Sequence, residues 1–135
     1  MNHINVEEVI DEPDAVIGTR LLNSCPTLVL FDMGASHSFI SRAFVNKHNL
    51  ATSTMLNPVR VSSPGGEMLV TTECRTLTMV IGKELFPVNL IILETQGLDV
   101  ILGMDWMAPF EGIIDCGNRA IMLTTPEKKK IKIKV

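Results

Sequence analysis

The chain has 135 residues, of which 46% are hydrophobic and 20% are charged, and its formal net charge is −3. This composition is typical of one globular domain and argues against a disordered chain or a pair of domains. No apolar run reaches the roughly 18 residues that a membrane-spanning helix needs, and the first residues lack the basic and apolar regions of a secretory signal. We therefore expect no membrane partner.

The charges are unevenly distributed along the chain. Residues 127–135 hold five of the twelve basic residues and one of the fifteen acidic ones, so seven basic residues face fourteen acidic ones in the rest. An acidic body disfavours nucleic-acid binding by this domain. We expect residues 125–135 to form a solvated basic terminal strand or linker, and contact of this tail with RNA or an acidic partner is the alternative.

The cysteines and histidines give no sign of a disulfide framework or a metal centre. Cys25, Cys74 and Cys116 are odd in number, widely spaced and without a Cys-x-x-Cys pair. This pattern favours a reduced, cytoplasmic protein. The three histidines show no metal-ligand spacing, so we expect neither a metal nor another cofactor.

The N-terminal part predicts a leader, a hairpin and a helix. Residues 1–13 are polar and acidic, which is typical of a flexible leader. Residues 14–22 and 27–31 read as two strands joined by a turn at Asn23-Ser24. From Ser38, apolar residues recur at helical spacing, so we expect a helix that Ser38 caps.

The middle of the chain predicts a second hairpin followed by two strands. The arms 55–62 and 68–72 flank Pro64-Gly65-Gly66, which is a strong hairpin signal. The segments 76–81 and 85–93 read as strands, and Pro87 indicates an edge or a bulge because proline cannot donate to a sheet ladder.

The C-terminal part predicts a short buried strand, a short helix and a last hairpin. Val100, Ile101 and Leu102 lead to Gly103, and a short helix is expected to begin at Asp105 as its N-cap. Residues 112–123 form the expected hairpin. In it Asp115 is a turn acid, and Asp99 is likewise expected in a turn. Strands dominate, so residues 14–124 are predicted to be one small all-β domain.

One acid stands out from this scaffold. Asp32 ends the apolar strand 27–31, and Met33, Gly34, Ala35 and Ser36 follow it. A carboxylate at the exit of a buried strand is costly unless the protein uses it. We therefore interpret Asp32 as a catalytic acid, with a turn or helix-cap acid as the alternative.

Three stretches together resemble a known family. Residues 32–36 (Asp-Met-Gly-Ala-Ser), 37–41 (His-Ser-Phe-Ile-Ser) and 99–106 (Asp-Val-Ile-Leu-Gly-Met-Asp-Trp) are similar to the retropepsin-like aspartic protease domain of gypsy-type LTR-retrotransposon polyproteins. The resemblance implies a closed β-barrel with one or two short helices. It also implies a two-fold homodimer that cleaves an extended peptide or polyprotein with one aspartate from each chain.

The resemblance also assigns the surrounding segments. Pro64, Gly65 and Gly66 would form a flap that closes over the peptide and excludes water. Ile101 and Leu102 would support the loop that carries Asp32, and Gly103 would let the two segments cross. Ser36 and Ser38 lack a Ser/His/Asp pattern and are expected to hydrogen-bond the active-site loop, while His37 either tunes the acid or is structural.

Simple chemistry independently favours a pair of acids. One carboxylate cannot act at once as the base for water and as the acid for the amide. Two carboxylates about 3 Å apart cannot both ionise, so they share a proton and divide these tasks. A chain of this length supplies one such acid, and a two-fold dimer supplies the second.

Met33 departs from the family pattern, which has Ser or Thr at this position. In the family that hydroxyl bonds across the dimer, and a methionine side chain has no donor. The alternative hypothesis is therefore a catalytically weak or inactive retropepsin-like module that dimerises or binds peptides.

Overall fold

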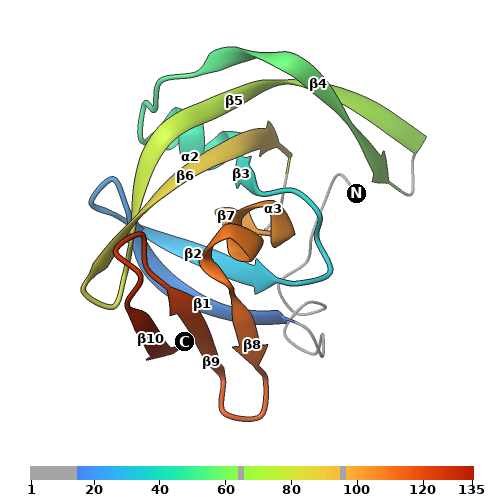
Figure 1. Cartoon of the computed structure of the whole chain (residues 1–135). Helices are drawn as coiled ribbons and strands as arrows, with labels where there is room; N and C mark the ends of the chain where they lie inside the picture. Colours follow the sequence, from blue (N-terminus) through green and yellow to red (C-terminus); the bar gives the residue numbers. More distant parts are fainter. Residues whose placement is uncertain (1–14, 64–65, 95–96) are drawn as a thin grey trace.

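The computed structural model describes residues 15–63, 66–94 and 97–135 (Figure 1). The expectation of a mostly-β chain is confirmed. The strands are β1 (Ala15–Leu22), β2 (Cys25–Asp32), β3 (Phe39–Ser41), β4 (Ser53–Ser63), β5 (Gly66–Ile81), β6 (Glu84–Leu93), β7 (Val100–Leu102), β8 (Ile113–Asp115), β9 (Ala120–Thr124) and β10 (Lys130–Lys134). The helices are α2 (Arg42–Lys47), α3 (Met104–Met107) and the 3-10 turn η1 (Ala108–Phe110).

Two sheets organise these strands. The large sheet has the order β1-β2-β7-β3-β6-β5-β4, and the small sheet has the order β10-β9-β8. β1 also pairs with β5, at Leu21–Val80 and Leu22–Met79. In Figure 1 the β4–β5 hairpin arches over the top of the molecule, and the small sheet lies at the opposite end.

The first hairpin matches its prediction. β1 and β2 are antiparallel, and Asn23 and Ser24 join them with φ angles of 47° and 69°. Two consecutive positive φ angles define the turn type whose twist suits a tight hairpin. Asn23 also fixes the turn, because its Oδ1 accepts a hydrogen bond from the Thr78 N–H at 2.8 Å.

β2 is buried on both faces, which explains its continuous apolar run. Val29 and Phe31 belong to the main core cluster, whereas Leu30 belongs to a second cluster with Leu98 and Ile101. The strand therefore carries Asp32 from the centre of the molecule rather than from its surface.

The predicted helix from Ser38 begins later than expected. Phe39 and Ile40 lie in β3, where they pair with β7 on one side and with β6 on the other. The N-cap of α2 is Ser41, whose Oγ accepts the Phe44 N–H at 3.0 Å. The helical cap at Ser38 was wrong because sheet pairing overrode the local spacing.

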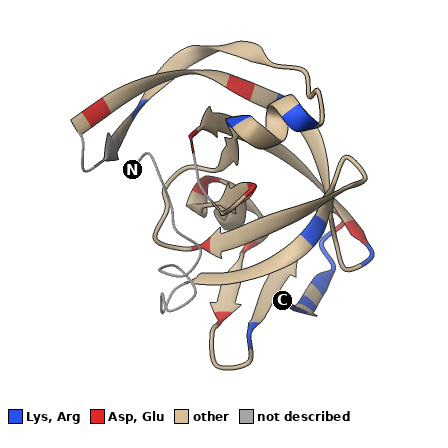
Figure 2. Cartoon of the chain, turned by 180° about the vertical axis from the view of Figure 1, so that it is seen from behind, with Lys and Arg blue, Asp and Glu red and all other residues tan. Residues whose placement is uncertain are grey.

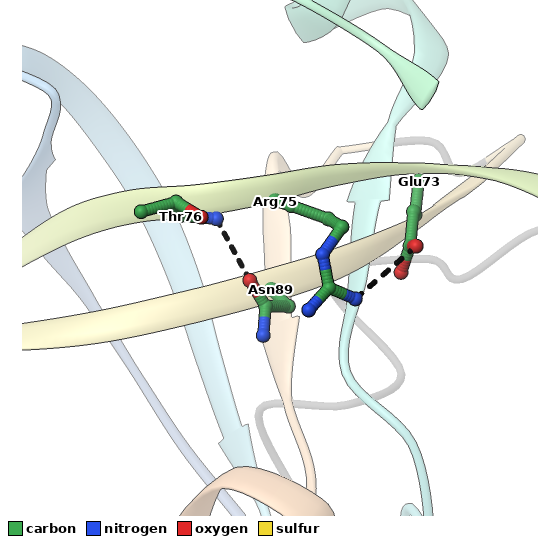
Figure 3. A network of polar contacts seen from close by, with 4 residues as sticks. All are labelled: Glu73, Arg75, Thr76 and Asn89. Atoms are coloured by element: carbon green, nitrogen blue, oxygen red, sulfur yellow. Dashed lines mark hydrogen bonds and ion pairs between the residues drawn. The ribbon is translucent and has the colours of Figure 1, made fainter. Parts of the chain in front are cut away.

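β5 joins two predicted strands into one. Its register with β6 shifts between Cys74 and Leu77, and Thr76 has a φ of 59°. The Thr76 N–H donates to the Asn89 Oδ1 at 2.7 Å, as Figure 3 shows. A side-chain acceptor thus replaces a ladder partner at the irregularity, and the strand continues through it.

Pro87 lies where β6 has an open side. It pairs with Thr78 of β5, whereas β3 pairs with β6 only at Ile91, Ile92 and Leu93. The predicted edge position is confirmed for this part of the strand. The Pro87 carbonyl accepts a hydrogen bond from the Trp106 Nε1–H at 3.2 Å.

The C-terminal residues form a strand of the small sheet. β10 is antiparallel to β9, and Ile131 and Ile133 are half-buried against the main core cluster. Lys130, Lys132 and Lys134 alternate with them and are exposed. Figure 2 shows the resulting stretch of basic residues at the C-terminus.

Candidate active site

β7 supports the strand that carries Asp32. The two strands are parallel, with Leu30 opposite Ile101 and Phe31 opposite Leu102. Ile101 and Leu102 are almost completely buried. Both residues therefore lie beside the strand that ends at Asp32, which is the position expected of residues that support its loop.

The turn after β2 orients the Asp32 carboxylate. The Gly34 N–H donates to Asp32 Oδ1 at 2.8 Å, and the Ala35 N–H donates to the Asp32 carbonyl at 3.2 Å. A Cβ at position 34 would lie 3.1 Å from Oδ1, closer than most side chains tolerate. Asp32 is half-buried, so its carboxylate remains accessible while one oxygen is held by a backbone donor.

Gly103 lets the loop from Asp32 to Ser38 cross the start of α3. A Cβ at this position would lie 2.4 Å from the His37 carbonyl oxygen and 2.6 Å from that of Ala35. The Met104 N–H donates to the Ala35 carbonyl at 2.7 Å, which fastens the crossing. The absence of a side chain at Gly103 is thus a requirement of the crossing.

Ser38 and Asp105 form a clamp behind this loop. The Ser38 Oγ–H donates to Asp105 Oδ1 at 2.5 Å, and the Ser38 N–H donates to Asp105 Oδ2 at 3.2 Å. The Gly103 N–H donates to Ser38 Oγ at 2.9 Å. Ser38 was expected to hydrogen-bond the active-site loop, but its side chain bonds Gly103 and Asp105, on the segment that this loop crosses.

The predicted N-cap role of Asp105 was wrong. Gly103 is the N-cap of α3, and Asp105 lies in the first turn. Its carboxylate contacts a residue 67 positions earlier instead of its own helix. Local sequence gives no signal for a contact at this separation.

Met33 points away from the acid. It is half-buried and packs against the main core cluster of its own chain. It does not belong to the residues that line the cleft described next. Its neighbours Asp32 and Gly34 do line that cleft, so the side chain at position 33 leaves the turn on the opposite side.

A cleft of about 410 Å³ opens beside Asp32. It brings together residues from the turn after β2 and from β3, β4, β6 and β7. They are Asp32, Gly34, Ala35, Ser36, His37, Phe39, Arg60, Val61, Leu93 and Ile101. The sequence singled out the turn residues and Ile101. It missed Arg60, Val61 and Leu93, which carry no local signal because only the sheet topology places them there. Phe39 belongs to the motif at residues 37–41, but it was not identified as a site residue.

The β4–β5 hairpin covers this cleft. Val61 and Val70 from the hairpin form an apolar cluster with Ile91 and Leu93 of β6. Gly66, at the start of β5, has a φ of 116°, and a Cβ there would meet nothing within 4 Å. Pro64 and Gly65, the other residues of the predicted flap tip, lie outside the described residues.

Two further acids have structural contacts. Asp115 accepts hydrogen bonds from the side chain and backbone of Asn118, which hold the pKa of its carboxyl below the ordinary value. It is the turn acid that the sequence predicts. Asp99 lies in a bend, and its Oδ2 accepts the Leu28 N–H at 2.8 Å, so it also ties this bend to β2.

The described part of the chain has no cluster of three or more His, Cys, Asp or Glu residues that could hold a metal ion. None of its helices is long and apolar enough to cross a membrane. Cys25, Cys74 and Cys116 form no disulfide with one another. Burial, with a smaller effect from Glu73, raises the pKa of the Cys74 thiol.

Comparison with known proteins points to one family. The sequence model described as retroviral aspartyl protease matches residues 1–129. The structure is similar to the retroviral protease-like domain of Ddi1 from Leishmania major, with a TM-score of 0.66 and 14% identity, over 91% of this chain and 94% of that one. It is also similar to EIAV protease in complex with the inhibitor HBY-793, with a TM-score of 0.57 and 17% identity, over 75% of this chain and 92% of that one. The search of curated proteins found no match.

Proposed function

Because this chain belongs to the retroviral aspartyl protease family and has a retropepsin-like fold, we propose that it is an aspartic endopeptidase whose catalytic residue is Asp32. The observation that carries the proposal is the half-buried Asp32 carboxylate, held by the Gly34 N–H beside a cleft. The fold, the turn and the covering hairpin all support the same assignment.

The proposed mechanism needs Asp32 from two chains. In a two-fold dimer the two carboxylates share one proton, and the ionised one removes a proton from water. The protonated one donates to the carbonyl oxygen of the substrate as the water attacks. Asp115, in the second Asp-x-Gly stretch, lies on the small sheet and does not line the cleft, so among the described residues Asp32 is the one acid of the cleft.

We propose that the substrate is an extended peptide that binds between the β4–β5 hairpin and the floor of the cleft. Apolar residues of the cleft, such as Val61, Leu93 and Ile101, suit alternate side chains of an added strand. Pro64, Gly65 and Gly66 would form the tip of a flap that excludes water. The extra pairing of β1 with β5 supports a sheet that closes into a barrel.

We also propose what kind of protein this domain belongs to. The motif at residues 32–41, together with residues 99–106, suggests a protease domain of a gypsy-type retrotransposon polyprotein, which it would cleave. We place the start of this domain at residue 14 and extend it beyond residue 124 to include β10, because β10 pairs with β9 and packs Ile131 and Ile133 against the main core cluster. Three cysteines that form no disulfide with one another support the proposal of a reducing, cytoplasmic setting.

One observation favours a second candidate function. Met33 carries no hydroxyl for a bond across the dimer, and it packs into the core of its own chain. A dimer without that bond would hold the two acids less firmly. The second candidate is therefore a weakly active or inactive module that dimerises or binds peptides.

A cleavage assay separates these two candidates. The purified chain is incubated with a peptide library at acidic pH, beside an Asp32→Ala variant and an Asp115→Ala variant. We expect cleavage by the native chain and by Asp115→Ala, and none by Asp32→Ala. Cleavage that survives Asp32→Ala contradicts the assignment, and peptide binding without cleavage by the native chain favours the inactive module.

A further inference from the structure

The charged side chains of the cleft have an unexpected balance. Beside the proposed catalytic Asp32, the lining residues that can carry charge are His37 and Arg60. In a dimer that shares one proton between two aspartates, the pair would carry a single negative charge. Two copies of Arg60 would face it, so the wall of the cleft has an excess of positive charge.

Within residues 15–63, 66–94 and 97–135, no acidic side chain neutralises Arg60. It is an exposed residue of β4, the edge strand of the large sheet, opposite Leu69 of β5. Its side chain makes no hydrogen bond or ion pair with any other residue that the structure describes. Two other arginines do have such partners: Arg42 pairs with Glu94 at 3.3 Å, and Arg75 pairs with Glu73 at 3.3 Å.

His37 adds a polar group to the same cleft. Its Nδ1 lies 3.2 Å from Ser36 Oγ, and its ring is 6.4 Å from that of Phe39, centroid to centroid. These contacts fix the ring and leave Nε2 without a hydrogen bond to the described residues. In the tautomer with a proton on Nε2, this nitrogen can donate a hydrogen bond to a substrate side chain.

From this arrangement we infer that the cleft selects peptides with an aspartate or glutamate side chain beside the cleaved bond, bound by the guanidinium of Arg60. This inference rests on the proposed function, because it names the substrate class of the same site. A carboxylate can accept two hydrogen bonds from the planar donors of a guanidinium, and its negative charge strengthens them. A neutral amide of the same shape cannot form such a charge-assisted bond. Two-fold symmetry places an Arg60 on each side of the cleaved bond, so the acidic preference extends to both sides.

The test uses matched peptide pairs. Peptides cleaved from a mixed library are resynthesised with each Glu replaced by Gln, and kcat/KM is measured for the native chain, Arg60→Gln and Arg75→Gln. We expect the native chain to favour the Glu peptide by about three- to tenfold, as expected for a charge-assisted bond at a partly exposed site. Arg60→Gln should remove this preference, and Arg75→Gln, which alters an arginine outside the cleft, should keep it.

Two results would overturn the inference: equal cleavage of the Glu and Gln peptides, or a preference that Arg60→Gln leaves unchanged. If the native chain cleaves nothing, the proposed function fails separately. A labelled peptide library is then screened for binding, and the Glu and Gln forms of the peptides that bind are compared by fluorescence anisotropy. Tighter binding of the Glu peptides that is lost in Arg60→Gln then supports the cleft's selectivity. Equal binding of both peptides contradicts it.

Discussion

At the scale of single residues, Asp32 and Gly34 behave as their local sequence suggests. A buried strand ends in an acid, and a following glycine donates its N–H to the carboxylate. These contacts are within two residues of each other, which is why the sequence alone predicts them. Ser38 and Asp105 meet across 67 positions, and no local pattern predicts that pair.

If the proposed function is right, the side chain at position 33 should influence both the dimer and the rate of cleavage. Met33→Thr supplies a hydroxyl that the partner chain's equivalent can bond, so we expect a tighter dimer, by on the order of 1–3 kcal/mol for a restored bond, and faster cleavage. Sedimentation and peptide cleavage measure the two effects. Met33→Leu, which keeps the apolar packing and adds no hydroxyl, is the control and should change neither quantity. Unaltered dimerisation and cleavage in Met33→Thr would show that the missing hydroxyl has no role here.

Gly103 supports a prediction about stability. In Gly103→Ala the new Cβ would overlap the carbonyl oxygens of His37 and Ala35, so the active-site loop must move. We expect a loss of about 1–3 kcal/mol in the free energy of unfolding and a fall in cleavage. Gly117→Ala is the matched control, because the nearest atom to its Cβ is Asp115 Oδ1 at 3.6 Å and stability should change by less than about 0.5 kcal/mol. If the two variants were equally stable in urea unfolding, the close approach of the Asp32–Ser38 loop to Gly103 would not require a glycine.

At the scale of elements, hairpins are predicted better than helices. The β1–β2 turn and the β4–β5 arms have local turn residues or alternation, and the structure contains both hairpins. The helix expected from Ser38 starts at Arg42 instead, because β6 and β7 recruit Phe39 and Ile40 into a strand. Pairing with distant strands is a tertiary effect that a local helical spacing does not reveal.

β10 gives the element-scale prediction. Removal of residues 127–135 takes Ile131 and Ile133 from the core and uncovers β9, so we expect unfolding to become easier by about 2–4 kcal/mol, given the value of a buried isoleucine. Thermal and urea unfolding measure the loss. A chain with Lys130, Lys132 and Lys134 all changed to Gln keeps the two isoleucines and should remain close to native stability. If the truncated chain were as stable as the full one, β10 would be an appendage rather than part of the core.

At the scale of the whole molecule, the sheet order brings the parts of the candidate site together. β2, β7 and β3 lie side by side and carry Asp32, its support and part of the cleft wall. The pairing of β1 with β5 joins strands from distant parts of the sequence, and no pattern along the chain predicts it. The cleft holds one aspartate, and the proposed chemistry needs two.

A mixing experiment tests this central claim most directly. The native chain, at a fixed amount, is mixed with increasing amounts of Asp32→Asn, which preserves shape but cannot supply the ionised acid, and cleavage is measured after the subunits exchange. If each site takes one Asp32 from each of two chains, native pairs become rare and cleavage falls as the inactive chain is added. Cleavage that stays constant, whatever the amount of Asp32→Asn, would contradict a shared site.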